Sequence, residues 1–366
     1  IFIPGDMGRP SFLLVGKETA MKETFGSTCH GAGRVHSRTA MKRMMKGRNL
    51  PREMEDRGVT VLAHGKSALA EEMPEAYNGD TKLHYETMGD PSNPTILLIM
   101  GLGAQMVAFR DEFCGILVDA GFHIIRFDNR DVGLSSKTPG DPPVLQELLA
   151  AQWEEPNDPN VPYLLSDMAN DAVAVLDATG VEKAHLVGVS MGGMIAQTIV
   201  IDHPDRVLTL TSIMSTTGSP DVGTAKPELM MKMPLAVPST REEAIENSVE
   251  TFRLISGPHF DAEDHALESA MTYDRNWNPN AQSFQIAAIF SSGDRTDALR
   301  SSTTPTLVIH GRLDPLVQLS GGEATASAIP NSKLVIFDDM GHDLPEVLWP
   351  EITKEIIDHA RANAGN

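Results

Sequence analysis

The chain has 366 residues, of which 41% are hydrophobic, so it can bury the core of one large domain or of two smaller ones. Its net charge of −20 argues against nucleic acid as a partner, and it has no run of about eighteen apolar residues that would predict a transmembrane helix. Cys29 and Cys114 lie too far apart in sequence to suggest a disulfide framework or a metal cluster, which favours a reducing, cytoplasmic location.

The charge divides the chain into two parts. Residues 1–73 contain 12 Lys and Arg against 8 Asp and Glu, whereas the remaining residues contain 18 against 42. So abrupt a change of sign suggests two pieces of different origin. The first residues lack the basic and long apolar regions of a secretory signal peptide, so we expect none there. We predict a first part over residues 1–76 and a second part over residues 77–366.

The first part contains two glycine-rich turns among short predicted helices and strands, one of them a strand at residues 11–15. The turns have the sequences PGDMG, at residues 4–8, and GSTCHGAGR, at residues 26–34. The glycines beside His30 and Arg34 would let backbone amides and a guanidinium group approach a phosphate. Spacing alone favours the simpler interpretation, in which these are ordinary turns with a surface histidine.

Three runs of this part together resemble the C-terminal part of the RNA-splicing ligase (RtcB) family. They are PGDMG, FGSTCHGAGRVHSR at residues 25–38, and LAEEMPEAY at residues 69–77. That family joins RNA ends with GTP and manganese. The resemblance implies that His30 takes the covalent guanylate and that Gly31, Gly33 and Arg34 lie along the nucleotide.

The family's metal ligands belong to a longer N-terminal part that this sequence lacks. Without metals, the charge of phosphoryl transfer would be poorly stabilised. We therefore interpret residues 1–76 as a small α+β ligase-like fragment without activity of its own, joined to the second part by a natural fusion or by a sequence error. Bound GTP, manganese and nucleic acid are not expected.

From residue 80 onward, predicted strands and helices alternate. The strands are expected at residues 82–87, 95–100, 123–127, 185–189, 207–214, 306–310 and 333–337, and the helices at residues 109–120, 166–179, 194–200 and 350–360. Ser166 is expected to cap the second of these helices, and Gly180 to end it. Repeated strand–helix units predict an α/β fold, with a doubly wound, mostly parallel sheet covered by helices on both faces.

The strand pattern disappears between residues 215 and 304. Helices are expected at residues 241–255 and 262–270, with Ser239 and Glu242 as a capping box. We predict a helical cap over residues 216–303. Its methionines at positions 230, 231 and 233 either line an acyl pocket or fill the core of the cap, and the core interpretation is favoured.

The sequence GVSMG at residues 188–192 fits the G-x-S-x-G pattern of a nucleophile elbow. The pattern alone is common, but here it follows a buried strand and precedes a helix, which is the context that the elbow requires. Glycines two before and two after Ser190 would let the strand and the helix approach closely while the serine adopts a strained backbone conformation.

A serine hydroxyl becomes a nucleophile when a histidine accepts its proton and a carboxylate orients that histidine. In this topology the acid and then the histidine should follow the ends of later strands. Asp314 follows the strand at residues 306–310, and His342 follows the strand at residues 333–337. We therefore predict that Asp314 and His342 complete a triad with Ser190.

Five other residues fit less well as partners of Ser190. His310 precedes the acid and is interpreted as structural, while Asp338 and Asp339 share a strand end with His342. Asp128 begins a tight loop, whose backbone it should bond. His359 lies on the terminal helix and should face solvent.

The oxyanion that forms on the substrate needs two backbone amides as donors. Met191 follows the nucleophile and should supply one of them. The other should come from the glycine-rich loop after the strand at residues 95–100. Leu102 is the first choice and Gly103 the alternative.

With these residues placed, residues from about 78 to the end resemble the α/β-hydrolase superfamily, in its esterase and lipase-like branch that includes antibiotic methylesterases. The runs MGLGAQM, at residues 100–106, and FDNRDVGLS, at residues 127–135, are especially similar. The resemblance implies that Ser190, Asp314 and His342 are nucleophile, acid and base, and that Leu102 and Met191 form the oxyanion hole.

We predict a serine hydrolase that cleaves a small-molecule carboxylic ester through an acyl-enzyme, without a cofactor, a metal or a membrane. Lactone, thioester and carbon–carbon bond hydrolysis stay open because one triad serves all of them. A GTP- and manganese-dependent RNA ligase is the alternative if the first part defines the activity. The sequence leaves the oligomeric state open.

Overall fold

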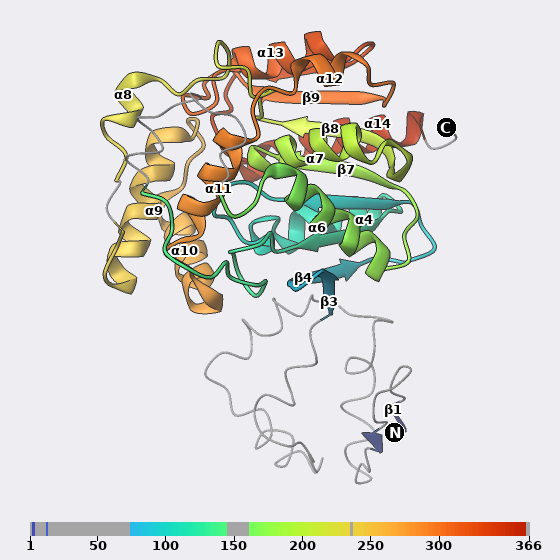
Figure 1. The fold of residues 1–366 in the computed structure, drawn as a ribbon, viewed down its shortest axis with the longest axis horizontal. Helices are drawn as coiled ribbons and strands as arrows, with labels where there is room; N and C mark the ends of the chain where they lie inside the picture. Colours follow the sequence, from blue (N-terminus) through green and yellow to red (C-terminus); the bar gives the residue numbers. More distant parts are fainter. Residues whose placement is uncertain (1, 4–11, 14–73, 145–160, 235–236, 364–366) are drawn as a thin grey trace. The chain divides into compact units, whose positions relative to one another are not determined.

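The computed structural model describes residues 2–3, 12–13, 74–144, 161–234 and 237–363 (Figure 1). The chain divides into two units, Ile1–Met73 and Pro74–Asn366. In the first unit, β1 (Phe2–Ile3) pairs antiparallel with β2 (Phe12–Leu13), which lies within the strand predicted at residues 11–15. The other elements predicted in this unit fall outside the described residues, as do His30, Gly31, Gly33 and Arg34.

The second unit is built on a mostly parallel sheet, as predicted, and this sheet has eight strands, one more than the sequence analysis expected. Its strands are β3 (Glu75–Asn78), β4 (Thr81–Met88), β5 (Thr95–Ile99), β6 (His123–Phe127), β7 (Ala184–Val189), β8 (Val207–Ile213), β9 (Thr306–Gly311) and β10 (Lys333–Phe337). They lie in the order β10-β9-β8-β7-β5-β6-β4-β3. Neighbours from β10 to β6 are parallel, whereas β4 pairs antiparallel with β6 and β3 pairs antiparallel with β4.

Strand β3 crosses the predicted boundary between residues 76 and 77. It pairs with β4 through Ala76 and Leu83, and both side chains are buried in the core. Because this pairing begins at Glu75, the hydrolase-like unit includes the last residues of the run that resembles the ligase family.

Helices cover both faces of the sheet, which is what a run of fully buried strand residues requires. Outside the cap, the α-helices that the structure describes are α4 (Asp111–Asp119), α6 (Leu165–Ala178), α7 (Met191–Asp202), α13 (Leu319–Ala328) and α14 (Trp349–Ala362). Successive residues of a strand point to opposite faces, and Leu97 and Leu98 of β5 are both completely buried. Leu97 belongs to an apolar cluster with α6 and α7, whereas Leu98 belongs to a second cluster with α4 and α14.

The cap lies between β8 and β9. Its helices are α8 (Pro227–Met230), α9 (Arg241–Ile255), α10 (Ala262–Asn276), α11 (Ala281–Ser291) and α12 (Thr296–Arg300). Helices α9 and α10 pack side by side next to the sheet (Figure 1). The sequence predicted α9 and the start of α10 but neither α11 nor α12. The core interpretation of the cap methionines is wrong for Met231, whose side chain is 79% exposed.

Two predicted helix caps are wrong, although α9 begins at the predicted residue. Helix α6 begins after Leu164, whose amide donates to the Asp167 carboxylate, so Ser166 lies in the first turn instead of at the cap. Helix α9 is capped by Thr240, whose hydroxyl accepts the Glu243 amide. In both places a side chain next to the predicted one bonds a backbone amide of the first turn or of the residue before it.

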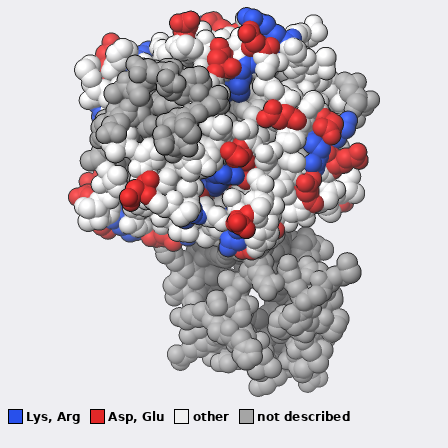
Figure 2. Space-filling view, viewed as in Figure 1, with Lys and Arg blue, Asp and Glu red and all other residues white. Residues whose placement is uncertain are grey.

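The described surface mixes charges of both signs. On the face drawn in Figure 2, Lys and Arg side chains lie among Asp and Glu side chains. None of the helices in the described part of the chain is both long and apolar enough to span a membrane.

A buried histidine on β7 makes the stability of this fold depend on pH. The His185 ring lies against Phe122, its Nδ1 is 2.9 Å from the Thr209 hydroxyl, and its Nε2 has no partner among the described residues. Burial, with a smaller contribution from His359, lowers the pKa of His185 to about 4. The unfolded chain binds a proton at this histidine near pH 6.5, so the stability that the neutral ring contributes is full above pH 6.5 and is lost as the pH falls towards 4.

We expect His185→Gln to reduce the loss of unfolding free energy between pH 7 and pH 4.5 by about 2 kcal/mol. Urea unfolding of the wild type and the variant at both pH values measures this difference. His203→Gln, which removes a more exposed histidine, is the control. An equal loss in wild type and His185→Gln would show that the buried ring does not control the acid response.

Candidate active site

Ser190 occupies a strained turn between β7 and α7. Its backbone has φ 55° and ψ −118°, a conformation that a serine rarely adopts. A Cβ atom at Gly188 would lie 2.2 Å from the carbonyl oxygen of Gly192, and one at Gly192 would lie 2.0 Å from that of Ile99. Both positions therefore require glycine, which explains the spacing of the motif.

The structure brings Ser190, Asp314 and His342 together from three separate parts of the sequence. The His342 Nε2 atom lies 3.0 Å from the Ser190 hydroxyl oxygen, and its Nδ1 atom lies 2.7 Å from an oxygen of the Asp314 carboxylate. The other oxygen of that carboxylate accepts the amides of Leu316 and Val317 at 2.9 Å each. The carboxylate is thus held in one orientation and can keep the imidazole in the tautomer that accepts a proton at Nε2.

The competing residues make other contacts. The His310 ring is fully buried and donates to the carbonyl of Val317, and burial lowers its pKa. Asp338 pairs with Arg312, and Asp339 pairs with His259. Asp128 accepts the backbone amides of Met106 and Leu134, as expected for a residue that begins a tight loop.

The prediction for His359 is wrong. Its ring is half-buried and donates to the carbonyl of Pro305, at 3.2 Å. The cause is the packing of the last turns of α14 beside the loop that leads into β9, which the pattern within the helix alone did not reveal. Burial lowers the pKa of this histidine as well.

The glycine-rich loop after β5 passes directly beside Ser190. A Cβ atom at Gly101 would lie 3.2 Å from that of Ser190. The Gly103 amide is already bonded, because it donates to the side chain of Gln285 at 2.7 Å. In contrast, the described residues provide no acceptor for the amides of Leu102 and Met191. This geometry favours Leu102 over Gly103 as the loop's donor.

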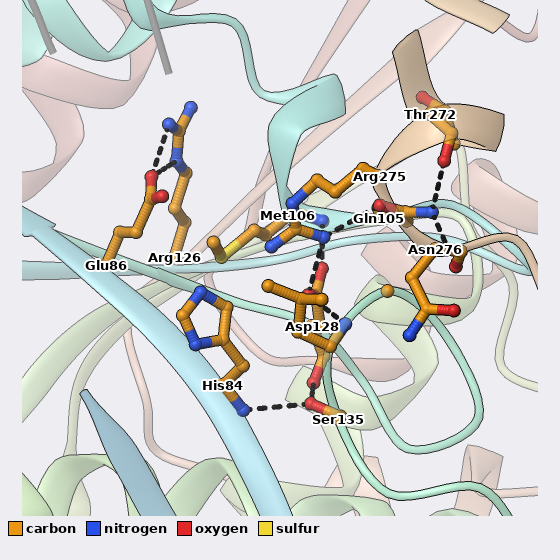
Figure 3. Close-up of polar contacts among 12 residues, drawn as sticks. His84, Glu86, Gln105, Met106, Arg126, Asp128, Ser135, Thr272, Arg275 and Asn276 are labelled. Carbon is orange, nitrogen blue, oxygen red and sulfur yellow. Dashed lines mark hydrogen bonds and ion pairs between the residues drawn. The ribbon is translucent and has the colours of Figure 1, made fainter. Parts of the chain in front are cut away.

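Residues that the sequence analysis did not identify tie the cap to this loop. Figure 3 shows the Gln105 amide group donating to the carbonyls of Thr272 and Asn276 on α10. Arg275, also on α10, donates to both Gln105 and the Asp128 carboxylate at 2.7 Å. No periodic pattern marks these polar residues, so only the tertiary structure reveals them.

The cap also contacts the loop that carries the histidine. The His342 amide donates to the carbonyl of Ile255, the last residue of α9, at 2.8 Å. The Asp343 carboxylate accepts the amides of Gly257 and Gly341, at 3.2 and 3.1 Å. Burial raises the pKa of Asp343 in spite of these bonds. Within the described residues, no group of three His, Cys, Asp or Glu side chains is placed to hold a metal ion.

Comparison with known families decides the class of the second unit. Residues 94–347 match the model of the alpha/beta hydrolase fold family. The chain belongs to this family. Rhodomycin D methylesterase from Streptomyces peucetius is 30% identical to this hydrolase over 306 residues, covering 78% of this chain and 97% of the relative.

Solved structures with the same fold have different activities. The enol-lactonase from Burkholderia xenovorans has a TM-score of 0.60 and 21% identity, and covers 79% of this chain and 100% of its own. A 2-hydroxy-6-oxo-6-phenylhexa-2,4-dienoate hydrolase from Rhodococcus has a TM-score of 0.61 and 20% identity, and covers 79% of this chain and 98% of its own. At this identity the likeness shows the fold of the hydrolase, and its reaction must be argued from the site.

The first unit matches a different family. Residues 1–82 match the tRNA-splicing ligase RtcB model, so the predicted resemblance of this segment is confirmed. The RtcB ligase of Archaeoglobus fulgidus is 56% identical over 77 residues, which are 21% of this chain and 16% of that ligase. The matched segment therefore spans about a sixth of the length of that ligase.

Proposed function

We propose that this protein is a serine hydrolase that cleaves a small-molecule carboxylic ester through an acyl-enzyme, without a cofactor. The observation that supports the proposal is the continuous set of short contacts from Ser190 through His342 to Asp314, placed at a strained elbow. In the proposed reaction the Ser190 oxygen attacks the ester carbonyl while its proton moves to His342 Nε2. The amides of Leu102 and Met191 stabilise the negative oxygen of the tetrahedral intermediate.

The remaining steps of the reaction use the same groups. His342 gives the proton to the departing alcohol, so the alcohol leaves neutral and the acyl group stays on Ser190. Water then attacks the acyl-enzyme, with His342 accepting its proton. The bond from the acyl carbon to the Ser190 oxygen breaks as His342 returns that proton to Ser190, and the acid is released. Asp314 stays ionised throughout and stabilises the imidazolium that forms twice in each cycle.

We propose methyl esters of carboxylic acids as the first substrates to test. The support is the methylesterase relative from Streptomyces peucetius, whose sequence aligns over nearly its full length. Lactones and carbon–carbon bonds next to a carbonyl are the competing substrates, because hydrolases of both kinds share the fold. We do not propose RNA ligation, since the matched segment is 16% of the length of the ligase.

A substrate panel tests this proposal. The full chain is incubated with methyl and p-nitrophenyl esters of aromatic and aliphatic acids, a γ-lactone and a vinylogous diketone, and acid release is followed by pH titration. A fluorophosphonate probe is added in parallel, and the labelled peptide is located by mass spectrometry. We expect ester hydrolysis and a label on Ser190. Turnover of the lactone or diketone without any ester turnover would contradict the ester assignment, and a label on another residue would contradict the nucleophile.

A further inference from the structure

The glycine-rich loop beside the nucleophile, which we define as the oxyanion loop (residues 100–106), is fastened at four points. Asn129 donates to the carbonyl of Met100, and the Asp128 carboxylate accepts the amide of Met106, both at 2.9 Å. These two contacts come from the loop after β6. The other two come from the cap, at Gln105 and at Gly103. The cap therefore holds the oxyanion loop at Gly103 and Gln105, and the loop after β6 holds its ends.

The contact at Gly103 is made by one side chain, Gln285 of α11. This glutamine is completely buried and uses both ends of its amide. Its Oε1 atom accepts the Gly103 amide at 2.7 Å, and its Nε2 atom donates to the carbonyl of Arg130 at 2.9 Å. Arg130 is itself held by a bidentate contact with Asp171. The glutamine thus connects the oxyanion loop to a second loop that is already rigid.

The chemistry of the two contacts requires an amide at this position. An amide N–H needs an acceptor and a carbonyl needs a donor, so one orientation of the glutamine satisfies both. An ionised carboxylate would bond the Gly103 amide but would face the Arg130 carbonyl with a second acceptor. A hydrocarbon side chain would leave a buried amide unpaired, and the loop would have to move to recover a partner.

The position of this bond matters because it is one residue from the proposed oxyanion donor. Gly103 has φ +67°, so the chain turns sharply immediately after Leu102. With the Gly103 amide bonded to the cap, the Leu102 amide is the one that stays available beside Ser190. An oxyanion donor is effective only when it is held in place before the reaction.

We propose that Gln285 is a positioning residue that fixes the oxyanion loop, so that the cap completes the oxyanion hole. This inference rests on the proposed serine hydrolase function. The hydrogen bonds of the Gln285 side chain go to Gly103 and Arg130, not to Ser190 or His342, so it acts through Gly103. It should therefore affect stabilisation of the tetrahedral intermediate while leaving binding of the uncharged ester almost unchanged.

The test compares Gln285→Leu and Gln285→Glu with the wild type, using Ser292→Ala as control. Ser292 also joins α11 to the sheet side of the molecule, by accepting the Leu165 amide, but it lies away from the oxyanion loop. For Gln285→Leu we expect kcat to fall about 30-fold with KM changed less than about threefold, because removing one whole oxyanion donor costs roughly 100- to 1,000-fold. Gln285→Glu keeps the acceptor for Gly103 and should recover part of the loss. Ser292→Ala should retain the wild-type kcat.

Two further measurements separate positioning from a general disturbance. An alkyl trifluoromethyl ketone, which forms a tetrahedral adduct with the serine, should bind Gln285→Leu more weakly by the same factor as the loss in kcat, while the product acid binds as in wild type. Amide hydrogen exchange should become faster in residues 100–106 and stay unchanged in α7. If Gln285→Leu does not fold, Gln285→Glu gives the same comparison, with a smaller loss expected.

The outcomes distinguish this inference from the proposed function. Unchanged kcat and unchanged exchange in the oxyanion loop would overturn the role of Gln285, even if Ser190 is confirmed as the nucleophile. A rise in KM with an equal weakening of product-acid binding would also overturn it. The substitution would then have altered the substrate-binding pocket and not the oxyanion loop. A wild type that hydrolyses no ester would contradict the proposed function, and the exchange experiment would still decide whether Gln285 fixes the loop.

Discussion

Ser190→Ala is expected to lower kcat for ester hydrolysis by roughly 10⁴- to 10⁶-fold. The substitution removes the attacking oxygen and its contact with His342 and leaves the rest of the elbow unchanged. Alanine has the same Cβ as serine, so the strained backbone at φ 55° costs it no more than it costs serine. The measurement is the initial rate at which the best ester substrate is hydrolysed, followed down to the background rate of hydrolysis in buffer.

Ser332→Ala is the matched control for this variant, because it removes a hydroxyl that bonds the carbonyl of Ala326 far along the chain from the elbow. It should hydrolyse esters at the wild-type rate. Circular dichroism and thermal unfolding should show both variants folded. Substantial turnover by folded Ser190→Ala would mean that another group attacks the ester, and the proposed mechanism would have to be abandoned.

Asp314→Asn should lower kcat by about 10⁴-fold without a large change in KM. One carboxylate oxygen of Asp314 accepts two backbone amides, so the oxygen of an asparagine would take that place. Its NH₂ group would then point at His342 Nδ1, where the carboxylate now accepts a hydrogen bond. The imidazole would have to carry its proton on Nε2, and in that tautomer it cannot accept the proton of Ser190.

Asp338→Asn provides the control, since this aspartate lies just after β10 and pairs with Arg312 at the surface. The same chemical change there should leave kcat unchanged. The two variants are compared over pH 6 to 9, because a tautomer defect persists at every pH, whereas a shifted titration would be recovered at higher pH. Wild-type activity in Asp314→Asn would exclude this aspartate as the orienting acid and would direct attention to the carboxylates near the end of β10.

We could predict that Ser190, Asp314 and His342 lie close together because most strands of the sheet are parallel. Every parallel strand ends at the same edge, so a residue that follows a strand lies near the residues that follow its neighbours. Ser190, Asp314 and His342 follow β7, β9 and β10, and β7 and β10 are separated by only two strands in the sheet. The short apolar runs and their order along the chain are therefore enough to predict that these three residues lie at the same edge of the sheet.

Local predictions failed at two helix starts, where a side chain next to the predicted one makes the capping contact. Ser166 and Ser239 both precede helical patterns, yet Asp167 and Thr240 make the capping contacts. Hydrogen bonds of this kind differ by less than about 1 kcal/mol, so small differences in geometry decide between them. His359 failed for another reason, since its partner Pro305 lies 54 residues away in the sequence.

The sequence by itself determined the fold family, the elbow at Ser190 and the order of the residues that follow the strands, because strand periodicity and glycine spacing are local properties of the chain. Only the tertiary structure decided how the cap joins the site. Gln285 lies 182 residues from Gly103, and Arg275 lies 147 residues from Asp128. Whether a buried polar side chain meets its partner depends on how the cap helices pack onto the sheet, and no spacing along the chain expresses that packing.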